Sequence, residues 1–350
     1  MTTSIEEIFP LSPMQQGLLF HSLSAPDPAV YTVQVCCTIE GDLDCGAFQS
    51  AWQAVTDLHP ALRSDFDWEE LDEPVQVVHR SLRAAVECRG EEDLEGFLAE
   101  DRRRPFQLSE APLLRLSLLR AGTLRHLVWT YHHLLLDGWS ALLVLGQVFA
   151  AYAALRQGRP PALVPPRRFS DYVAWLRRLD REAAAAFWRR ELRGFGEPTP
   201  LPVRLAQDGP GTAGRAVAAL APDLTAALRS FARQHRLTLN TLVQGAWALA
   251  LGRAAGEEEV LFGATVSGRP PELAGADSMV GLFLNTLPVR VPVPPTAALA
   301  SWLADLQARQ VAVRQAQYVP LAAIQGWSEL PRDRPLFDSL LIYENHPVSA

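Results

Sequence analysis

The sequence predicts an α/β (α+β) fold built from two lobes of similar size. Segments typical of strands alternate with segments typical of helices along the whole chain. A length of 350 residues corresponds to about two ordinary domains. A stretch rich in Pro and Gly, residues 194–214, has the composition of a linker. We therefore predict an N-terminal lobe over residues 1–178 and a C-terminal lobe over residues 179–350.

The first lobe is expected to open with a helix over residues 12–23, because Ser12 suits the N-cap and Pro13 suits the first helical position. Apolar residues at helical spacing predict a second helix over residues 43–58. Runs rich in β-branched and aromatic residues predict the strands. The strands lie at 31–40, 75–79, 113–120 and 124–131, and a long helix begins near Trp139 and ends before Gly158.

The second lobe is expected to mix strands and helices in the same way. Its predicted strands cover residues 216–220, 259–266 and 283–291, and its helices cover 224–235, 238–254 and 299–315. Residues 337–343, FDSLLIY, read as a buried strand, and the sequence ends seven residues later. Because a core strand is rarely the last element of a domain, we expect the second lobe to be incomplete.

Composition excludes several classes of function. All 32 basic residues are Arg, so Schiff-base chemistry and a P-loop lysine are impossible. The 39 acidic residues give a net charge of −7, which argues against a nucleic-acid partner. The four cysteines lack metal-site spacing, and no signal peptide or membrane-spanning stretch is visible. We expect a reduced, cytoplasmic protein that binds no membrane.

The most specific local pattern is the run YHHLLLDGWS, residues 131–140. A strand delivers two adjacent histidines to its end, and an Asp-Gly pair opens a long helix. Successive strand residues point to opposite faces, so only one of His132 and His133 can face a given cleft. Histidine is the usual side chain for proton transfer near neutral pH. A buried packing role is the alternative for an isolated histidine, and no carboxylate or thiol cluster supports a metal.

This run resembles the HHxxxDG signature of condensation domains of nonribosomal peptide synthetases, which belong to the chloramphenicol acetyltransferase superfamily. Further stretches resemble the family's other motifs in the same order. They are PLSPMQQGLLFH at 10–21, HPALRSDF at 59–66, FSDYVAWL at 169–176, VGLFLNT at 280–286, YVPL at 318–321 and RDRPLF at 332–337.

The resemblance implies two chloramphenicol acetyltransferase-like lobes in a V-shaped pseudo-dimer, with the active site in a tunnel between them. It implies an enzyme of antibiotic biosynthesis and secondary metabolism, an acyltransferase that forms peptide bonds. A donor acyl or peptidyl group would pass from the phosphopantetheine thioester of an upstream carrier protein to the α-amine of an aminoacyl group on a downstream carrier. The domain itself would bind no cofactor and no metal. The partners would be both carrier proteins and neighbouring adenylation and epimerization domains, with the fragment itself monomeric.

The resemblance also implies roles for individual residues. His133 is the expected catalytic residue, as base or as positioning group, and Gly138 would offer its backbone N–H to the reacting centre. His132 would pack, and Asp137 would form a structural ion pair with Arg63. The residues expected to line the substrate tunnel are Trp139, Ser140, Asn285 and Thr286.

The residues at the motif positions resemble the condensation-domain subfamily that takes a donor ending in a D-residue more than they resemble other subfamilies. Three other functions stay open on the sequence alone. The chain could be an epimerization domain of the same superfamily, a stand-alone acyltransferase acting on soluble thioesters, or a noncatalytic domain that recruits carrier proteins.

Overall fold

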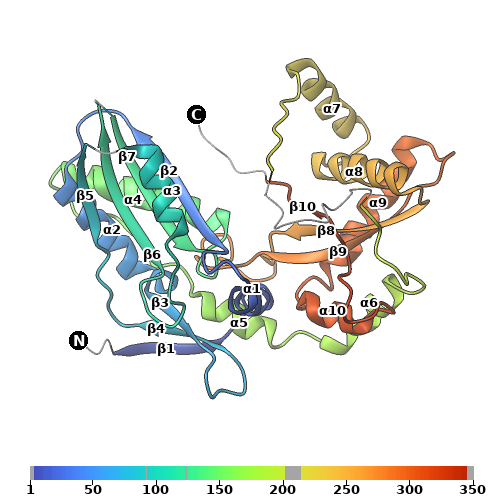
Figure 1. Ribbon diagram of the computed structural model, residues 1–350, viewed down its shortest axis with the longest axis horizontal. Coiled ribbons are helices and arrows are strands. Elements are labelled where there is room, and N and C mark those ends of the chain that lie inside the picture. The colour runs from blue at the N-terminus through green and yellow to red at the C-terminus, as the bar shows by residue number, and fades with distance from the viewer. Residues whose placement is uncertain (1–3, 92, 123, 202–213, 345–350) are drawn as a thin grey trace. The chain divides into compact units, whose positions relative to one another are not determined.

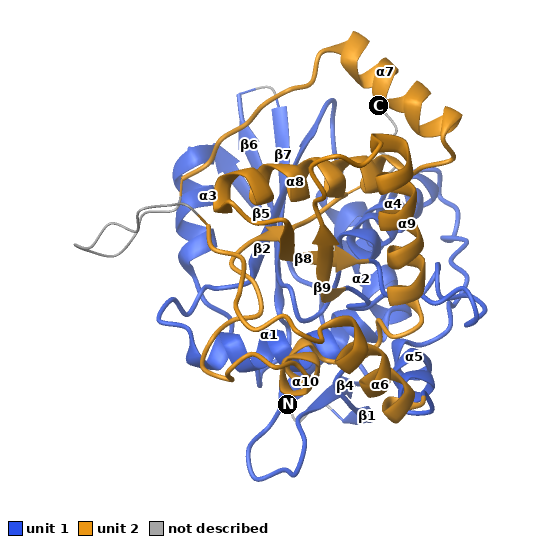
Figure 2. Cartoon of the chain, turned by 90° about the vertical axis from the view of Figure 1, so that its right-hand side faces the viewer, with its two compact units in different colours: residues 1–179, 267–284 blue, residues 180–266, 285–350 orange. Residues whose placement is uncertain are grey.

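The computed structural model describes residues 4–91, 93–122, 124–201 and 214–344. The chain divides into two compact units (Figures 1 and 2). Unit 1 comprises residues 1–179 together with 267–284, and unit 2 comprises residues 180–266 and 285–350. Each unit combines a β-sheet with covering helices, as the sequence predicted.

The main sheet of unit 1 has the strand order β2-β7-β6-β5. β7 pairs antiparallel with both β2 and β6, whereas the edge strand β5 runs parallel to β6. The bounds of these strands are Thr32–Ile39 for β2, Val86–Glu91 for β5, Leu114–Ala121 for β6 and Leu124–His132 for β7. A smaller sheet, ordered β1-β4-β3, contains Ile5–Pro10, Val75–His79 and Ser64–Asp67.

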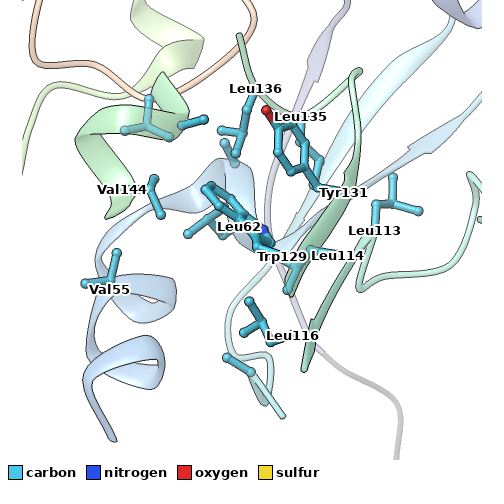
Figure 3. Packing of buried hydrophobic residues seen from close by; sticks show 14 of the residues in the cluster. Val55, Leu62, Leu113, Leu114, Leu116, Trp129, Tyr131, Leu135, Leu136 and Val144 are labelled. Atoms are coloured by element: carbon cyan, nitrogen blue, oxygen red, sulfur yellow. The ribbon is translucent and has the colours of Figure 1, made fainter. Parts of the chain in front are cut away.

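Helices α2 and α4 cover one face of the main sheet, and α3 contacts β2 and β7 on the other (Figure 1). Figure 3 shows Val55 of α2, Val144 of α4, and Trp129 and Tyr131 of β7 among the buried side chains between the helices and the sheet. These side chains belong to one buried hydrophobic cluster. The helices of unit 1 are α1 Pro13–Ser24, α2 Cys45–Leu58, α3 Leu94–Arg103, α4 Gly138–Arg156 and α5 Phe169–Leu176, with a 3-10 turn at Pro60–Arg63.

Helix α4 is the one element of the described residues that is long and apolar enough to cross a membrane by length and composition alone. Its inner face, however, packs into the core of unit 1 together with α2. A core helix of a globular domain can be equally long and apolar, so the length and hydropathy of α4 are weak evidence for a membrane span.

Unit 2 is built on the antiparallel pair β8 and β9, to which the short β10 adds in parallel. Helices α8 and α9 pack with these strands in one buried cluster, and residues of α6 and α10 form a second cluster. The bounds are α6 Arg181–Glu191, α7 Pro222–Gln234, α8 Leu239–Ala255, β8 Glu259–Val266, β9 Asn285–Pro292, α9 Leu299–Arg314, α10 Leu321–Trp327 and β10 Leu340–Leu341.

Residues 267–284 connect β8 to β9 but pack within unit 1. Val280 and Leu282 are buried in the main core of that unit, and Met279 and Phe283 are buried against α5. The predicted boundary between residues 178 and 179 placed this segment in the C-terminal lobe, whereas it packs in unit 1. The physical reason is the burial of these apolar side chains, which a linear reading of the chain cannot assign to one lobe or the other.

Two further expectations differ from the structure. Residues 216–220 form no strand, and within 337–343 only Leu340 and Leu341 are strand. Both stretches are short apolar runs, for which composition alone cannot distinguish a strand from extended coil. Most of the predicted linker, residues 202–213, lies outside the described residues.

Close packing of residues 267–284 depends on two glycines. Gly268 has φ +62°, and a Cβ there would lie 1.7 Å from the carbonyl oxygen of Phe283. At Gly281 a Cβ would lie 2.2 Å from the ring of Phe169 in α5. Only glycine therefore allows the segment to approach itself and α5 this closely.

We predict that Gly281→Ala lowers the free energy of unfolding by about 1–3 kcal/mol, because the added methyl group overpacks the Phe169 contact. Gly146→Ala in α4 is the matched control, since nothing lies within 4 Å of its Cβ position. The control should be neutral or stabilising by up to about 1 kcal/mol. Urea denaturation measures both changes, and equal stability of the two variants would contradict the packing described.

Candidate active site

The HHxxxDG run forms the connection between β7 and α4. His132 is the last residue of β7, and its N–H donates to the carbonyl oxygen of Leu113 at 3.0 Å. The N–H of His133 donates to the carbonyl oxygen of Tyr31 at 2.9 Å, and that of Leu135 donates to the carbonyl oxygen of His132 at 3.0 Å. The backbone thus leaves the sheet in a tight, hydrogen-bonded turn.

The three leucines after the histidines anchor this turn in the core. Leu134, Leu135 and Leu136 are all buried in the main cluster of unit 1, and Figure 3 shows two of them beside Tyr131. The side-chain amide of Gln15 in α1 donates to the carbonyl oxygen of Leu134 at 3.1 Å. The apolar triplet therefore fixes where the neighbouring histidine lies.

His132 is a buried, neutral histidine. Its Nδ1 accepts the N–H of Leu134 at 3.2 Å, so its ring proton resides on Nε2. Burial, and to a lesser degree the neighbouring His133, lower the pKa of His132 from 6.5 to about 4, while the backbone of Val30 acts in the opposite direction. A packing role for His132 stays a prediction.

The ring of His133 has a different hydrogen-bonding pattern from that of His132. Its Nδ1 lies 2.8 Å from the carbonyl oxygen of Leu136, which can only accept, so Nδ1 carries the proton. Within the described residues Nε2 has no hydrogen-bond partner, and the side chain is half-buried. This tautomer leaves the Nε2 lone pair available to accept a proton.

Asp137 is the N-cap of α4. Its Oδ1 accepts the N–H of Ser140 at 2.7 Å, and its own N–H donates to the carbonyl oxygen of Gly281 at 3.2 Å. Oδ2 accepts the N–H of Phe283 at 3.1 Å. The carboxylate, which is 1% exposed, thus begins the helix and holds residues 267–284 at the same time.

The ionic partner of Asp137 is Arg269. The guanidinium Nη2 lies 3.2 Å from Oδ1 and 3.4 Å from Oδ2, and it also donates to the hydroxyl of Ser140 at 2.8 Å. The guanidinium carbon Cζ of Arg269 lies 3.9 Å from the ring centroid of Phe283, which is a cation–π contact. Burial lowers the pKa of Arg269, and the Asp137 carboxylate opposes that shift.

The predicted ion pair between Asp137 and Arg63 is therefore wrong. Arg63 is buried, but its Nη1 lies 2.7 Å from Glu6 Oε2, and it also donates to the carbonyl oxygen of His79. Arg63 ends the 3-10 turn beside the small sheet and is used there. A motif argument could choose this arginine, but only the fold shows which arginine reaches Asp137.

Two of the residues expected to line a tunnel keep accessible surface. Trp139 is 39% exposed, and its Nε1–H donates to the carbonyl oxygen of Asp277 at 2.9 Å. Thr286 is half-buried in β9. A lining role for these two residues stays a prediction.

The other two residues expected to line a tunnel are buried. The hydroxyl of Ser140 donates to the carbonyl oxygen of Gly281 at 2.7 Å. The amide of Asn285 donates to the carbonyl oxygens of two residues preceding α10, Gln317 and Val319. The expected lining role is wrong for Ser140 and Asn285, because their polar atoms are used in holding the backbone.

Sequence reasoning missed Arg269, Tyr31 and Gln15. Arg269 lies in a Gly/Pro-rich run that looks like an ordinary loop. Tyr31 has φ +61°, unusual for a residue with a side chain, and its hydroxyl lies 2.8 Å from Nδ1 of His21. Nothing in the local sequence marks a non-glycine residue for such a conformation.

No group of three or more His, Cys, Asp or Glu side chains within the described ranges could hold a metal ion.

Comparison with known proteins identifies the family. The family model described as "Condensation domain" matches residues 5–350, so the chain belongs to the condensation domain family. One of the proteins that make up the linear gramicidin synthase of Brevibacillus parabrevis is 48% identical over 98% of this chain. Chondramide synthase cmdD of Chondromyces crocatus is 41% identical over 99%. The chain spans 7% and 10% of the lengths of these two relatives.

The fold comparison agrees. The starter condensation domain of rhizomide synthetase RzmA superposes with a TM-score of 0.81 at 22% identity, covering 96% of this chain and 78% of that one. The predicted chloramphenicol acetyltransferase-like α/β fold is confirmed by this likeness. The predicted family is confirmed by the family model and the sequence relatives.

A double-mutant cycle tests the reassigned ion pair. Arg269→Met and Asp137→Asn should each lower the free energy of unfolding by about 3–5 kcal/mol, because each leaves a buried group without its partner. The two changes should be non-additive, whereas Arg63→Met and Asp137→Asn should add to within about 0.5 kcal/mol. Coupling between Asp137 and Arg63 in place of Arg269 would contradict the structure.

The neutral state of His132 predicts a pH dependence of stability. The unfolded chain takes up a proton at its ordinary pKa of 6.5, whereas the folded chain does so only near 4. Stability should therefore fall as the pH is lowered from about 6.5 to about 4, by roughly 3 kcal/mol in total. His132→Gln should show a flatter dependence over the same range in urea titrations. Identical pH profiles of the two proteins would refute the assignment.

Proposed function

We propose that this chain forms amide bonds between two thioester-bound substrates. A donor acyl or peptidyl group on the phosphopantetheine thioester of one carrier protein is attacked by the α-amine of an aminoacyl group on a second carrier. The C–N bond forms and the donor C–S bond breaks. The proton that the amine loses ends on the released phosphopantetheine thiol of the donor carrier, and the lengthened peptide remains on the acceptor carrier. The observation that carries the proposal is the fixed imidazole of His133, with its proton on Nδ1 and a free lone pair on Nε2.

The tautomer of His133 matches what the reaction requires. A carbonyl oxygen cannot donate, so the hydrogen bond to Leu136 keeps Nδ1 protonated and leaves Nε2 as an acceptor. An acceptor at this position can hold or remove a proton of the attacking amine. The backbone bond from His133 to Tyr31 fixes the main chain that carries the ring.

Gly138 is the second proposed catalytic group. It is the first residue of α4, where N–H groups lack intrahelical acceptors and the helix carries partial positive charge. The Asp137 side chain satisfies the N–H of Ser140 and its carbonyl oxygen satisfies that of Ala141. We propose that the Gly138 amide stabilises the negative charge that develops on the thioester oxygen.

Magnitudes indicate how the rate enhancement is divided. A general base contributes about 10²–10⁴-fold, whereas holding two reactants together contributes roughly 7–11 kcal/mol. Most of the acceleration should therefore come from bringing two tethered substrates together. A variant without the imidazole should retain residual activity.

The proposed partners follow from the chemistry and from the sequence relatives. The partners are an upstream donor carrier and a downstream acceptor carrier, with neighbouring adenylation and epimerization domains. The preference for a donor ending in a D-residue, the cytoplasmic location and the absence of a resident cofactor are part of the same proposal. The names of the relatives, synthases of linear gramicidin and chondramide, are compatible with an assembly line for peptides.

Substitution of His133 tests the function directly. His133→Asn keeps a donor near Nδ1 but has no atom at the position of Nε2, so it should fold normally and slow single-turnover peptide transfer by about 10²–10⁴-fold. Two loaded carrier proteins serve as substrates, and mass spectrometry detects the dipeptidyl product. Unchanged turnover in the variant would remove His133 from the mechanism.

The same assay separates the alternative functions. An epimerization domain would invert the donor without forming a dipeptide, and a stand-alone acyltransferase would accept soluble thioesters equally well. A recruitment domain would form no product. Comparing L- and D-configured donors tests the stereochemical preference.

A further inference from the structure

Two cysteines from distant parts of the sequence lie together at the edge of the main sheet of unit 1. Cys45 is the first residue of α2, and Cys88 lies in the edge strand β5. Helix α2 and strand β5 contact each other, the two thiols lie close enough to interact, and both residues are free thiols. Cys45 is half-buried and Cys88 is exposed. Neither belongs to the candidate active site.

Specific hydrogen bonds hold α2 beside the chain that leads into β5. The amide of Gln53 donates to the carbonyl oxygen of Leu82 at 2.9 Å and accepts the N–H of Ala84 at 3.0 Å. One helical turn earlier, the amide of Gln49 donates to the carbonyl oxygen of Ala84 and accepts the N–H of Val86 at 2.7 Å. Each glutamine thus pairs with the backbone of this segment as a neighbouring strand would.

The two cysteines lie at the next position of this regular pairing between α2 and the segment that leads into β5. Four residues of a helix rise about 6 Å, and two residues of a strand advance about 6.6 Å, so the two spacings match. A step of four residues along α2 from Gln49 leads to Cys45, and a step of two along β5 from Val86 leads to Cys88. The contact between the thiols is therefore the end of a fixed register between two elements.

We propose that Cys45 and Cys88 form an oxidisable dithiol, which a two-electron oxidant converts into an intramolecular disulfide between α2 and β5. With hydrogen peroxide, one thiol is oxidised to a sulfenic acid and releases one water. The second thiol then displaces the hydroxyl group as another water, and the S–S bond forms. Each sulfur loses one electron and one proton, and the peroxide is reduced to the two waters.

The adjacent pair Cys36 and Cys37 cannot react in this way without distorting its strand. Both lie in β2, where successive side chains point to opposite faces. Cys37 packs against the core while Cys36 is exposed. This pair is therefore a natural internal control for the proposed site.

The reduced pair is expected to persist until an oxidant is supplied. Although the residue as a whole is exposed, partial burial of its sulfur together with the neighbouring Cys45 thiol raises the pKa of Cys88 to about 12, so this thiol stays protonated at neutral pH. Thiolates are the reactive form of cysteine. Oxidation of this pair therefore requires an added oxidant.

Closure of the disulfide would stabilise an exposed edge. Among the described strands, β5 pairs with β6 alone, and that pairing is irregular between Cys88 and Glu91. A covalent bond from β5 to α2 would enclose the chain between residues 45 and 88, which restricts the unfolded state. The oxidised protein should therefore melt at a higher temperature than the reduced protein, and a thiol reductant should reverse the difference.

Oxidation with diamide, followed by peptide mapping of the intact chain, tests the proposal. Titratable thiols should fall from the four in the sequence to two, with a loss of about 2 Da and a cross-linked peptide joining Cys45 to Cys88. The variant Cys36→Ser/Cys37→Ser should keep the mass loss, and Cys88→Ser should abolish it. The proposal is overturned if both Cys45 and Cys88 remain open to alkylation, if Cys36 or Cys37 is joined instead, or if only intermolecular products form.

Discussion

The buried ion pair between Asp137 and Arg269 is the interaction on which the candidate site depends. One carboxylate caps α4, accepts the N–H of Phe283 and neutralises a buried guanidinium. Removing either partner would leave an uncompensated charge in a nearly dry environment. The pair therefore ties the start of the helix to residues 267–284, and with them it fixes the turn that carries His133.

The two histidines of the motif illustrate how adjacent residues acquire different roles. His132 accepts a backbone N–H at Nδ1 and is held neutral by burial, whereas His133 donates from Nδ1 and keeps Nε2 free. The difference arises from the alternation of a strand and from the turn that follows it. Packing of the three leucines and the cap at Asp137 hold this arrangement before any substrate is bound.

Much of the fold could be predicted from the sequence, because periodicity and capping residues carry local information. Ser12 and Pro13 marked the start of α1, and β4 and β8 have the bounds that the sequence predicted. Contacts between distant residues could not be predicted in the same way. The arginine that pairs with Asp137 is 132 positions away, and the burial of Ser140 depends on a segment that enters from the second half of the chain. Short exposed strands such as β5 were missed because they lack a buried face with clear alternation.

The central claim is that the turn after β7 holds His133 in one tautomer, and the ¹⁵N chemical shifts of its imidazole test that claim most directly. In protein labelled at histidine, with His133→Asn used for assignment, spectra at about pH 8 should show a protonated Nδ1 and an unprotonated Nε2. A His133 ring protonated at Nε2, or one that averages between both tautomers, would contradict the account.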